Sequence, residues 1–133
     1  MISILVSFRN SRQPAIDCLR SIFQTFNLLG SADIEFLFID DHSDPEQKIP
    51  EMLAEFRSQI APAIKVTQFL FQQHQHYTRA LAYGLSAAKG RQVLFVSHDM
   101  LLTPDYVRTL LAVAASDDAI GLVRGVSPFV DAF

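Results

Sequence analysis

Carboxylates that could hold a cation or bind a nucleotide stand directly after apolar runs of the chain. Asp40 and Asp41 end one such run, and Asp99 follows another. A carboxylate in this position can hold a hard cation or accept a hydrogen bond from a ligand. It can also accept hydrogen bonds from loop amides or help to cap the next helix. The position of Asp99 by itself therefore fits a binding site and an ordinary loop equally well.

Four polar clusters share this placement. Arg9 lies in one of them and Arg79 shortly after another, and each could add a charge-assisted contact to a phosphate or remain a solvated surface residue. The histidines lack the Cys residues or His-x-x-x-His pair of a zinc site, which favours histidines hydrogen-bonded to ligand or water. The clusters are Ser7-Phe8-Arg9-Asn10, Asp40-Asp41, Gln72-Gln73-His74-Gln75-His76 and Ser97-His98-Asp99.

The runs before these clusters predict buried strands, and the stretches between them predict helices. Apolar residues recur at steps of three and four in the segments that begin near Pro14, Pro45, Tyr77 and Pro104. The alternation predicts an α/β fold, a Rossmann-like three-layer α/β/α arrangement with a mainly parallel sheet that ends after about five strands. Residues 126–133 carry no clear signal. The expected strands are residues 2–6, 34–39, 64–71, 93–96 and 120–123.

Parallel strands place their carboxyl ends at one edge of the sheet, where open α/β folds bind ligands. We therefore expect the four clusters to lie together, which favours a binding site over an ordinary loop for Asp99.

The first loop contains no glycine, which argues against a dinucleotide-binding oxidoreductase, and no phosphate-binding P-loop sequence occurs. Asp40 and Asp41 could instead accept hydrogen bonds from a base or ribose, and Asp99 could bind a divalent cation between two phosphates.

Composition limits the class of protein. The 133 residues fit a single domain, residues 1–133, with half of the residues hydrophobic and a net charge of −3. The absence of a basic cluster argues against nucleic acid as a partner. The single cysteine, Cys18, excludes an internal disulfide and suits a reducing, cytoplasmic compartment. We expect it to be a small buried hydrophobe. No targeting sequence or membrane span is expected from the apolar runs.

The ordered motifs resemble those of glycosyltransferase family 2, with its A-type nucleotide-diphosphosugar transferase fold. The resemblance covers nearly the whole chain and corresponds to the donor-binding half of such enzymes. The opening strand resembles the family's strand ending Pro-Thr-Tyr-Asn, and the other stretches resemble its Cys-Leu-x-Ser-Leu, Val-Asp-Asp-Gly-Ser and Phe-Leu-Asp-x-Asp-Asp-x-Leu-x-Pro-Asp motifs. The matching stretches are residues 3–10, 18–22, 38–43 and 94–105.

The resemblance implies a role for each matching residue. Asp99 corresponds to the last acidic residue of the Asp-x-Asp metal motif and would hold Mg²⁺ or Mn²⁺. Asp40 or Asp41 would contact the base or ribose, and Arg79 would face the diphosphate. The nucleotide-sugar site as a whole would comprise Ser7, Phe8, Arg9, Asn10, Asp40, Asp41, Arg79, Ser97 and His98.

Departures from the family's pattern keep a second hypothesis open. Ser97 stands where the first Asp of the metal motif is usual, and His74, His76 and Ala82 replace an Asn, a Gly and an Asn. These changes are the features that support the alternative hypothesis, a noncatalytic nucleotide-binding or protein-interaction module. The leading hypothesis remains a sugar-transferring, hexosyltransferase-type enzyme that uses a nucleotide-diphosphosugar donor and an unknown acceptor.

The resemblance also sets an expectation for the complete enzyme. Family members carry the acceptor site and catalytic base in a second half, after the fifth strand, and Asp131 is the last carboxylate here. We therefore expect a domain of a longer glycosyltransferase, with the catalytic residue outside this sequence. It would act in cell-envelope polysaccharide synthesis, in the cytoplasm or at the inner face of the membrane. Apolar surface exposed by truncation would favour self-association.

Overall fold

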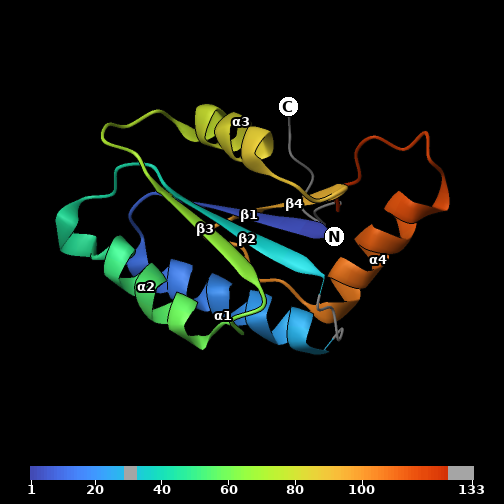
Figure 1. The fold of residues 1–133 in the computed structure, drawn as a ribbon, viewed down its shortest axis with the longest axis horizontal. Helices are drawn as coiled ribbons and strands as arrows, with labels where there is room; N and C mark the ends of the chain where they lie inside the picture. Colours follow the sequence, from blue (N-terminus) through green and yellow to red (C-terminus); the bar gives the residue numbers. More distant parts are fainter. Residues whose placement is uncertain (29–32, 126–133) are drawn as a thin grey trace, which may run out of the picture.

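A four-stranded parallel sheet forms the centre of the molecule (Figure 1). The computed structural model describes residues 1–28 and 33–125. The strand order is β3-β2-β1-β4, so β1 lies between β2 and β4. The register pairs Ile2 of β1 with Ile34 on one side and with Gln92 on the other. The strands are β1 (Ile2–Phe8), β2 (Ile34–Asp40), β3 (Lys65–Leu70) and β4 (Gln92–Ser97).

Helices follow each strand, as the apolar periodicity predicts. Pro50 lies in the first turn of α2 instead of interrupting a longer helix, because a short 3-10 turn, Pro45–Gln47, and a left-handed Lys48 come before it. Thr103 caps α4 by accepting a hydrogen bond from the Tyr106 amide at 3.3 Å. The α-helices are α1 (Arg12–Leu28), α2 (Ile49–Gln59), α3 (Tyr77–Ala87) and α4 (Pro104–Ser116).

The helices form two layers with the sheet between them (Figure 1). Helices α1, α2 and α4 contribute to the larger core on one face, and α3 covers the other face. Neighbouring residues of one strand point to opposite faces, so Ile4 packs in the larger core and Leu5 packs under α3. From β1 the chain adds β2 and β3 on one side, and it then crosses back to add β4 on the other side of β1. Because crossovers between parallel strands are right-handed, this reversal places α3 on the face opposite α1 and α2.

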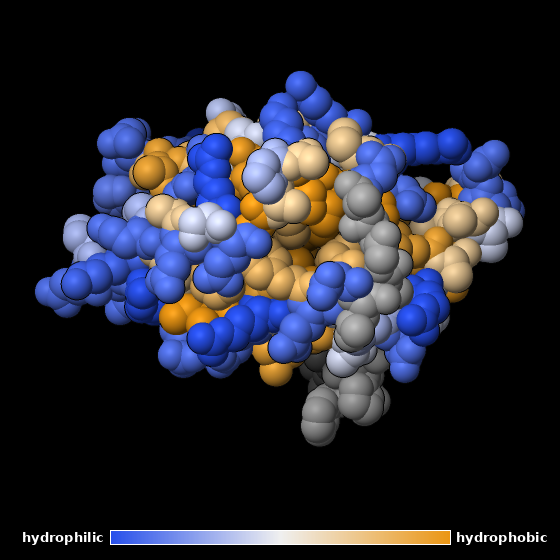
Figure 2. All heavy atoms as spheres, turned by 60° about the horizontal axis from the view of Figure 1, so that its bottom comes forward, coloured by the Kyte–Doolittle hydropathy of each residue, from blue (hydrophilic) through white to orange (hydrophobic). Residues whose placement is uncertain are grey.

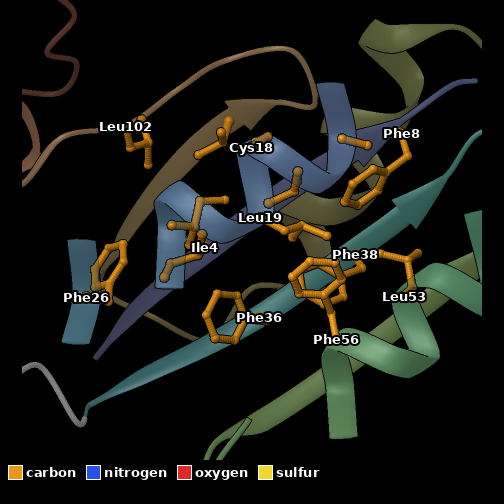
Figure 3. Packing of buried hydrophobic residues seen from close by; sticks show 14 of the residues in the cluster. Ile4, Phe8, Cys18, Leu19, Phe26, Phe36, Phe38, Leu53, Phe56 and Leu102 are labelled. Atoms are coloured by element: carbon orange, nitrogen blue, oxygen red, sulfur yellow. The ribbon is translucent and has the colours of Figure 1, made fainter. Parts of the chain in front are cut away.

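Aromatic and aliphatic side chains fill the larger core (Figure 3). Phe8 meets Phe38 edge to face with ring centroids 5.9 Å apart, and Phe36 lies 5.8 Å from Phe23 of α1. Burying a side chain of this size contributes about 1.5–3 kcal/mol to folding. Cys18 is fully buried in this core, as predicted.

The predicted fifth strand is wrong. Residues 120–123 form no strand, and the sheet within the described residues has four. The Ile120 amide donates instead to the Asp117 carbonyl at 3.1 Å, and Leu122 is 81% exposed. A run of apolar residues becomes a strand only when a neighbouring edge pairs with it, and within residues 1–28 and 33–125 β4 pairs with β1 alone. Residues 126–133, including Asp131, lie outside the described residues.

No helix among the described residues has both the length and the apolar character needed to cross a membrane. On the face that carries α1 and α2, apolar residues are exposed in a hollow between hydrophilic ones (Figure 2). A cavity of about 610 Å³ lies between the ends of α1 and α2 and the starts of β2 and β3, lined by Phe23, Phe26, Ile34, Phe36, Ile60 and Ile64 among others. This cavity is at the amino edge of the sheet, away from the polar clusters.

Candidate functional site

The strand order reverses between β1 and β4, which makes the carboxyl ends of these strands the expected ligand crevice. Ser7 pairs with Ser97 in the register, so the loops after β1 and β4 start side by side. The ring of His98 lies beside Phe8, with centroids 6.5 Å apart. The structure thus brings two of the four polar clusters together at this point.

The loop after β1 is bonded to the loop after β2. The Arg9 guanidinium donates to the carbonyl oxygen of Asp41 at 2.9 Å and to that of His42. The Asn10 amide donates to Ser43 Oγ at 2.9 Å, and Asn10 Oδ1 accepts from the Asp44 amide at 2.7 Å. Arg9 and Asn10 therefore join two loops of the sheet edge, a function that sequence reasoning had not assigned to them.

Asn10 and its neighbour adopt a backbone conformation that is uncommon for residues with a side chain. Asn10 has φ 54° and Ser11 has φ 53°, both in the left-handed region. His42 and His76, in the next two loops, also have positive φ, at 58° and 70°. Such conformations persist where surrounding bonds fix them, and three of the four loops at this edge contain one.

Asp40 ends β2 with one carboxylate oxygen occupied by its own loop. Its Oδ1 accepts from the Ser43 amide at 3.2 Å and from Ser43 Oγ at 2.5 Å. The residue is 4% exposed. Because Oδ1 serves the turn, only Oδ2 of Asp40 is left to accept a hydrogen bond from a ligand.

Asp41 joins the loop after β2 to the loop after β3. Its Oδ1 accepts from the Gln75 amide at 2.6 Å, and its Oδ2 lies 3.2 Å from His74 Nε2. The ring of His74 in turn lies against that of His76, with centroids 4.2 Å apart. Asp41 is 3% exposed, so its carboxylate is largely used inside the protein. The sequence showed no signal for the Gln75 contact, because it depends on how two distant loops meet.

Asp99 differs from both of these carboxylates. It lies in a tight turn closed by a hydrogen bond from the Met100 amide to the Ser97 carbonyl, 3.0 Å long. The residue is exposed, and its side chain makes no hydrogen bond or ion pair with residues 1–28 or 33–125. An exposed carboxylate without such partners at the carboxyl edge of a parallel sheet can bind a cation from solution.

The donor set around Asp99 fits one kind of ion. No group of three or more His, Cys, Asp or Glu residues that could hold a metal occurs in the described part of the chain. The sequence likewise favoured histidines hydrogen-bonded to ligand or water over a histidine metal site. A closed protein cage for zinc or calcium requires such a group. Mg²⁺, by contrast, is commonly bound through one or two carboxylates with substrate phosphates and water completing its shell. Asp99, whose carboxylate has no partner in the described part of the chain, fits this second arrangement.

Helix α1 packs directly under the turn that contains Asp99. Cys18 Sγ lies 3.6 Å from the Ser97 carbonyl oxygen, and Ser21 Oγ accepts from the Leu102 amide at 3.0 Å. Burial raises the pKa of the Cys18 thiol to about 12, and the negative charge of Asp99 acts in the same direction. The thiol therefore stays protonated and can donate its hydrogen.

Arg79 lies in the first turn of α3 and is exposed. Its Nη1 donates to Gln75 Oε1 at 3.3 Å, a contact between two side chains that leaves the other guanidinium hydrogens available. Arg79 thus borders the loop after β3, and the two contacts of Gln75 connect it to Asp41.

Comparisons with known proteins add two findings. The family described as Glycosyl transferase family 2 matches residues 3–130. No curated protein sequence matches the chain.

Solved structures share the fold at low sequence identity. A mannosyltransferase, PcManGT from Pyrobaculum calidifontis in complex with GDP-Man and Mn²⁺, matches with a TM-score of 0.73 at 18% identity, over 86% of this chain and 32% of that one. S. aureus TarS 1-349 in complex with UDP matches with a TM-score of 0.68 at 18% identity, over 85% of this chain and 31% of that one. The chain spans about a third of the length of these neighbours. At this identity the likeness shows the fold alone, which confirms the predicted α/β architecture.

Proposed function

The chain belongs to glycosyltransferase family 2, and we propose on this premise that it binds a nucleotide-diphosphosugar as the donor in sugar transfer. The observation that carries the proposal is the exposed carboxylate of Asp99, which has no hydrogen-bond or ion-pair partner among the described residues. It follows β4 at the carboxyl edge of the sheet, where the strand order reverses between β1 and β4. The neighbours that were solved with GDP-Man and with UDP support a nucleotide ligand for this fold.

In the proposed complex the nucleotide lies against the loops after β1 and β2. Arg9 and Asn10 act there by holding the two loops together. Ser7 and Phe8 are buried at the end of β1 and support this region from within the protein. Asp40 Oδ2 is the carboxylate oxygen that remains free for the base or ribose, because its partner oxygen is bonded to Ser43. Asp41 positions the loop after β3 through Gln75 instead of contacting the ligand.

The diphosphate is proposed to lie toward β4 and the start of α3. Ser97 and His98 line this side. The guanidinium of Arg79 is positively charged and can donate hydrogen bonds to the phosphate oxygens. Asp99 would hold Mg²⁺ or Mn²⁺, and the ion when bound would neutralise charge that develops on the leaving diphosphate. The Mn²⁺ in the mannosyltransferase complex is consistent with such an ion.

Finer features of the activity stay predictions. Hexosyl transfer is supported by the name of the mannosyltransferase neighbour, and a role in cell-envelope polysaccharide synthesis rests on the family resemblance. An inverting transfer needs a base beside the acceptor hydroxyl. We assign neither this base nor the acceptor site to a residue of this chain.

The expected self-association is supported by the exposed Tyr77, Tyr83 and Leu85 of α3, and light scattering would test it.

Calorimetry tests the proposal. The 133-residue chain is titrated with UDP, GDP and dTDP sugars, with Mn²⁺ and with chelator. We expect binding of at least one donor, strengthened by Mn²⁺, and Asp99→Asn should remove this strengthening while leaving binding in chelator unchanged.

Asp105→Asn is the matched control, because Asp105 is an exposed carboxylate six positions along the chain that is bonded to Arg108. It should behave as the unchanged protein. Failure to bind any of the nucleotides would refute donor binding, and full Mn²⁺ dependence in Asp99→Asn would refute the metal role of Asp99.

A further inference from the structure

Helix α1 holds the turn that contains Asp99 at both of its ends. At the first end, the Ser97 carbonyl oxygen accepts from Cys18 Sγ at 3.6 Å and from the Met100 amide at 3.0 Å. At the other end, the Leu102 amide donates to Ser21 Oγ at 3.0 Å. Residues 97–102 are thus anchored on one turn of α1. The two anchoring residues, Cys18 and Ser21, lie about 80 positions before the loop in the sequence.

Ser21 has a double role in this contact. Its hydroxyl donates to the Cys18 carbonyl at 2.7 Å, which directs the oxygen lone pairs outward from the helix toward the Leu102 amide. A helical serine can bond to a carbonyl one turn earlier without accepting from a distant segment. Ser58 of α2 is an example, with only a 2.6 Å bond to the Glu55 carbonyl.

Burial separates the anchors from the residue that they support. Cys18 is fully buried and Leu102 is 5% exposed, whereas their partners Ser97 and Ser21 are partly buried. Each anchor thus joins a core residue to one at the rim of the core. Asp99, between them, is exposed. The anchoring hydrogen bonds are partly buried, which reduces competition from water, whereas the carboxylate is free to meet a ligand.

We propose that Ser21 and Cys18 are positioning residues for the Asp99 carboxylate, so that the metal-dependent part of donor affinity depends on two side chains that do not touch the donor. This inference rests on the proposed function of Asp99. An ion held by one carboxylate and by substrate phosphates binds well only when that carboxylate is already in place, because ordering a mobile loop on binding costs affinity.

The first test needs no ligand. Ser21→Ala removes the acceptor of the Leu102 amide, Ser21→Thr keeps a hydroxyl, and Ser58→Ala is the control for losing a helical serine without a distant partner. Amide hydrogen exchange is measured in each folded variant. Exchange at Leu102 should be faster in Ser21→Ala by about fivefold to tenfold, the fold-change of one lost hydrogen bond, normal in Ser58→Ala and largely restored in Ser21→Thr.

The second test measures Mn²⁺ affinity by electron paramagnetic resonance in the presence of the nucleotide, UDP or GDP, that the unmodified chain binds. Ser21→Ala and Cys18→Ala should each weaken Mn²⁺ binding by about threefold to tenfold. Nucleotide affinity in chelator should stay constant, a pattern that general loss of stability does not produce. Ser21→Thr should recover most of the Mn²⁺ affinity.

The outcomes distinguish this inference from the proposed function. Normal Leu102 exchange in Ser21→Ala overturns the positioning role and leaves donor binding intact. An Mn²⁺ affinity of Ser21→Ala and Cys18→Ala that equals the affinity of Ser58→Ala does the same. Absence of nucleotide binding by the unmodified chain overturns the proposed function itself, and the role of Ser21 and Cys18 in metal binding with it.

Discussion

The carboxylate of Asp41 provides the sharpest test of how the carboxyl edge of the sheet is assembled. It accepts from the Gln75 amide at 2.6 Å and lies 3.2 Å from His74 Nε2, while only 3% of the residue is exposed. Asp41→Ala removes both interactions at once. It leaves the Gln75 amide in a partly buried position without its acceptor.

The expected loss follows from the two contacts. A hydrogen bond to a charged group contributes about 1.5–3 kcal/mol. The His74 contact contributes less than this, because the His74 side chain is 40% exposed and solvent screens the pair. We therefore expect Asp41→Ala to lower the free energy of unfolding by about 2–4 kcal/mol, and Asp41→Asn by about half as much because the amide oxygen can still accept from Gln75.

Urea unfolding followed by circular dichroism measures this difference. Asp44→Ala is the matched control, since Asp44 lies in the same loop, is exposed and makes no capping bond through its side chain. It should change the free energy of unfolding by less than about 0.5 kcal/mol. Equal stability of Asp41→Ala and Asp44→Ala would refute the conclusion that Asp41 joins the two loops.

Two further predictions concern pH and buried groups. Burial opposes ionisation of Glu35, but hydrogen bonds from Ser3 Oγ and the Lys89 amide outweigh it and lower the pKa of Glu35 below its ordinary 4.5. Its carboxylate thus stabilises the fold above that pH and less as pH falls through the lowered pKa. Glu35→Gln should cost more stability near pH 7 than near pH 3, and equal losses in urea unfolding at both would contradict this. The Cys18 thiol, with its pKa raised from 9.0 to about 12, should resist iodoacetamide near pH 8 until the chain is unfolded in urea; rapid labelling of the folded chain would contradict its burial. The stability that the protonated thiol contributes is complete below pH 9.0 and declines as pH rises toward 12.

Predictions about single elements depended on local patterns and were mostly correct. The runs that became β1, β2 and β4 are largely apolar because both faces of a parallel sheet are covered, which makes them visible in a sequence. The edge strand β3 is only partly buried and contains Thr67 and Gln68. The helix after Thr103 and Pro104 has its cap and first-turn proline where the sequence places them. Residues 120–123 show the limit of this reasoning, since their apolar character was not matched by a pairing edge.

The sequence also identified the edge of the sheet at which the polar clusters gather, but not what each residue does there. Asp40, Asp41 and Asp99 are chemically identical in a sequence. In the structure Asp41 is bonded on both oxygens, Asp40 on one, and Asp99 has no partner among the described residues. Arg9, expected beside a nucleotide, donates to the carbonyls of the next loop, a contact that the sequence did not indicate.

What the amino-acid sequence determined by itself is therefore the α/β architecture and the placement of four polar clusters after its strands, because periodicity and strand direction are properties of local segments. Only the tertiary structure decided that β4 returns to the side of β1, which sets the Asp99 turn on Cys18 and Ser21 of α1. These contacts join segments about 80 residues apart. Contacts at such separations depend on strand order and loop geometry, and both of these follow from packing the whole chain.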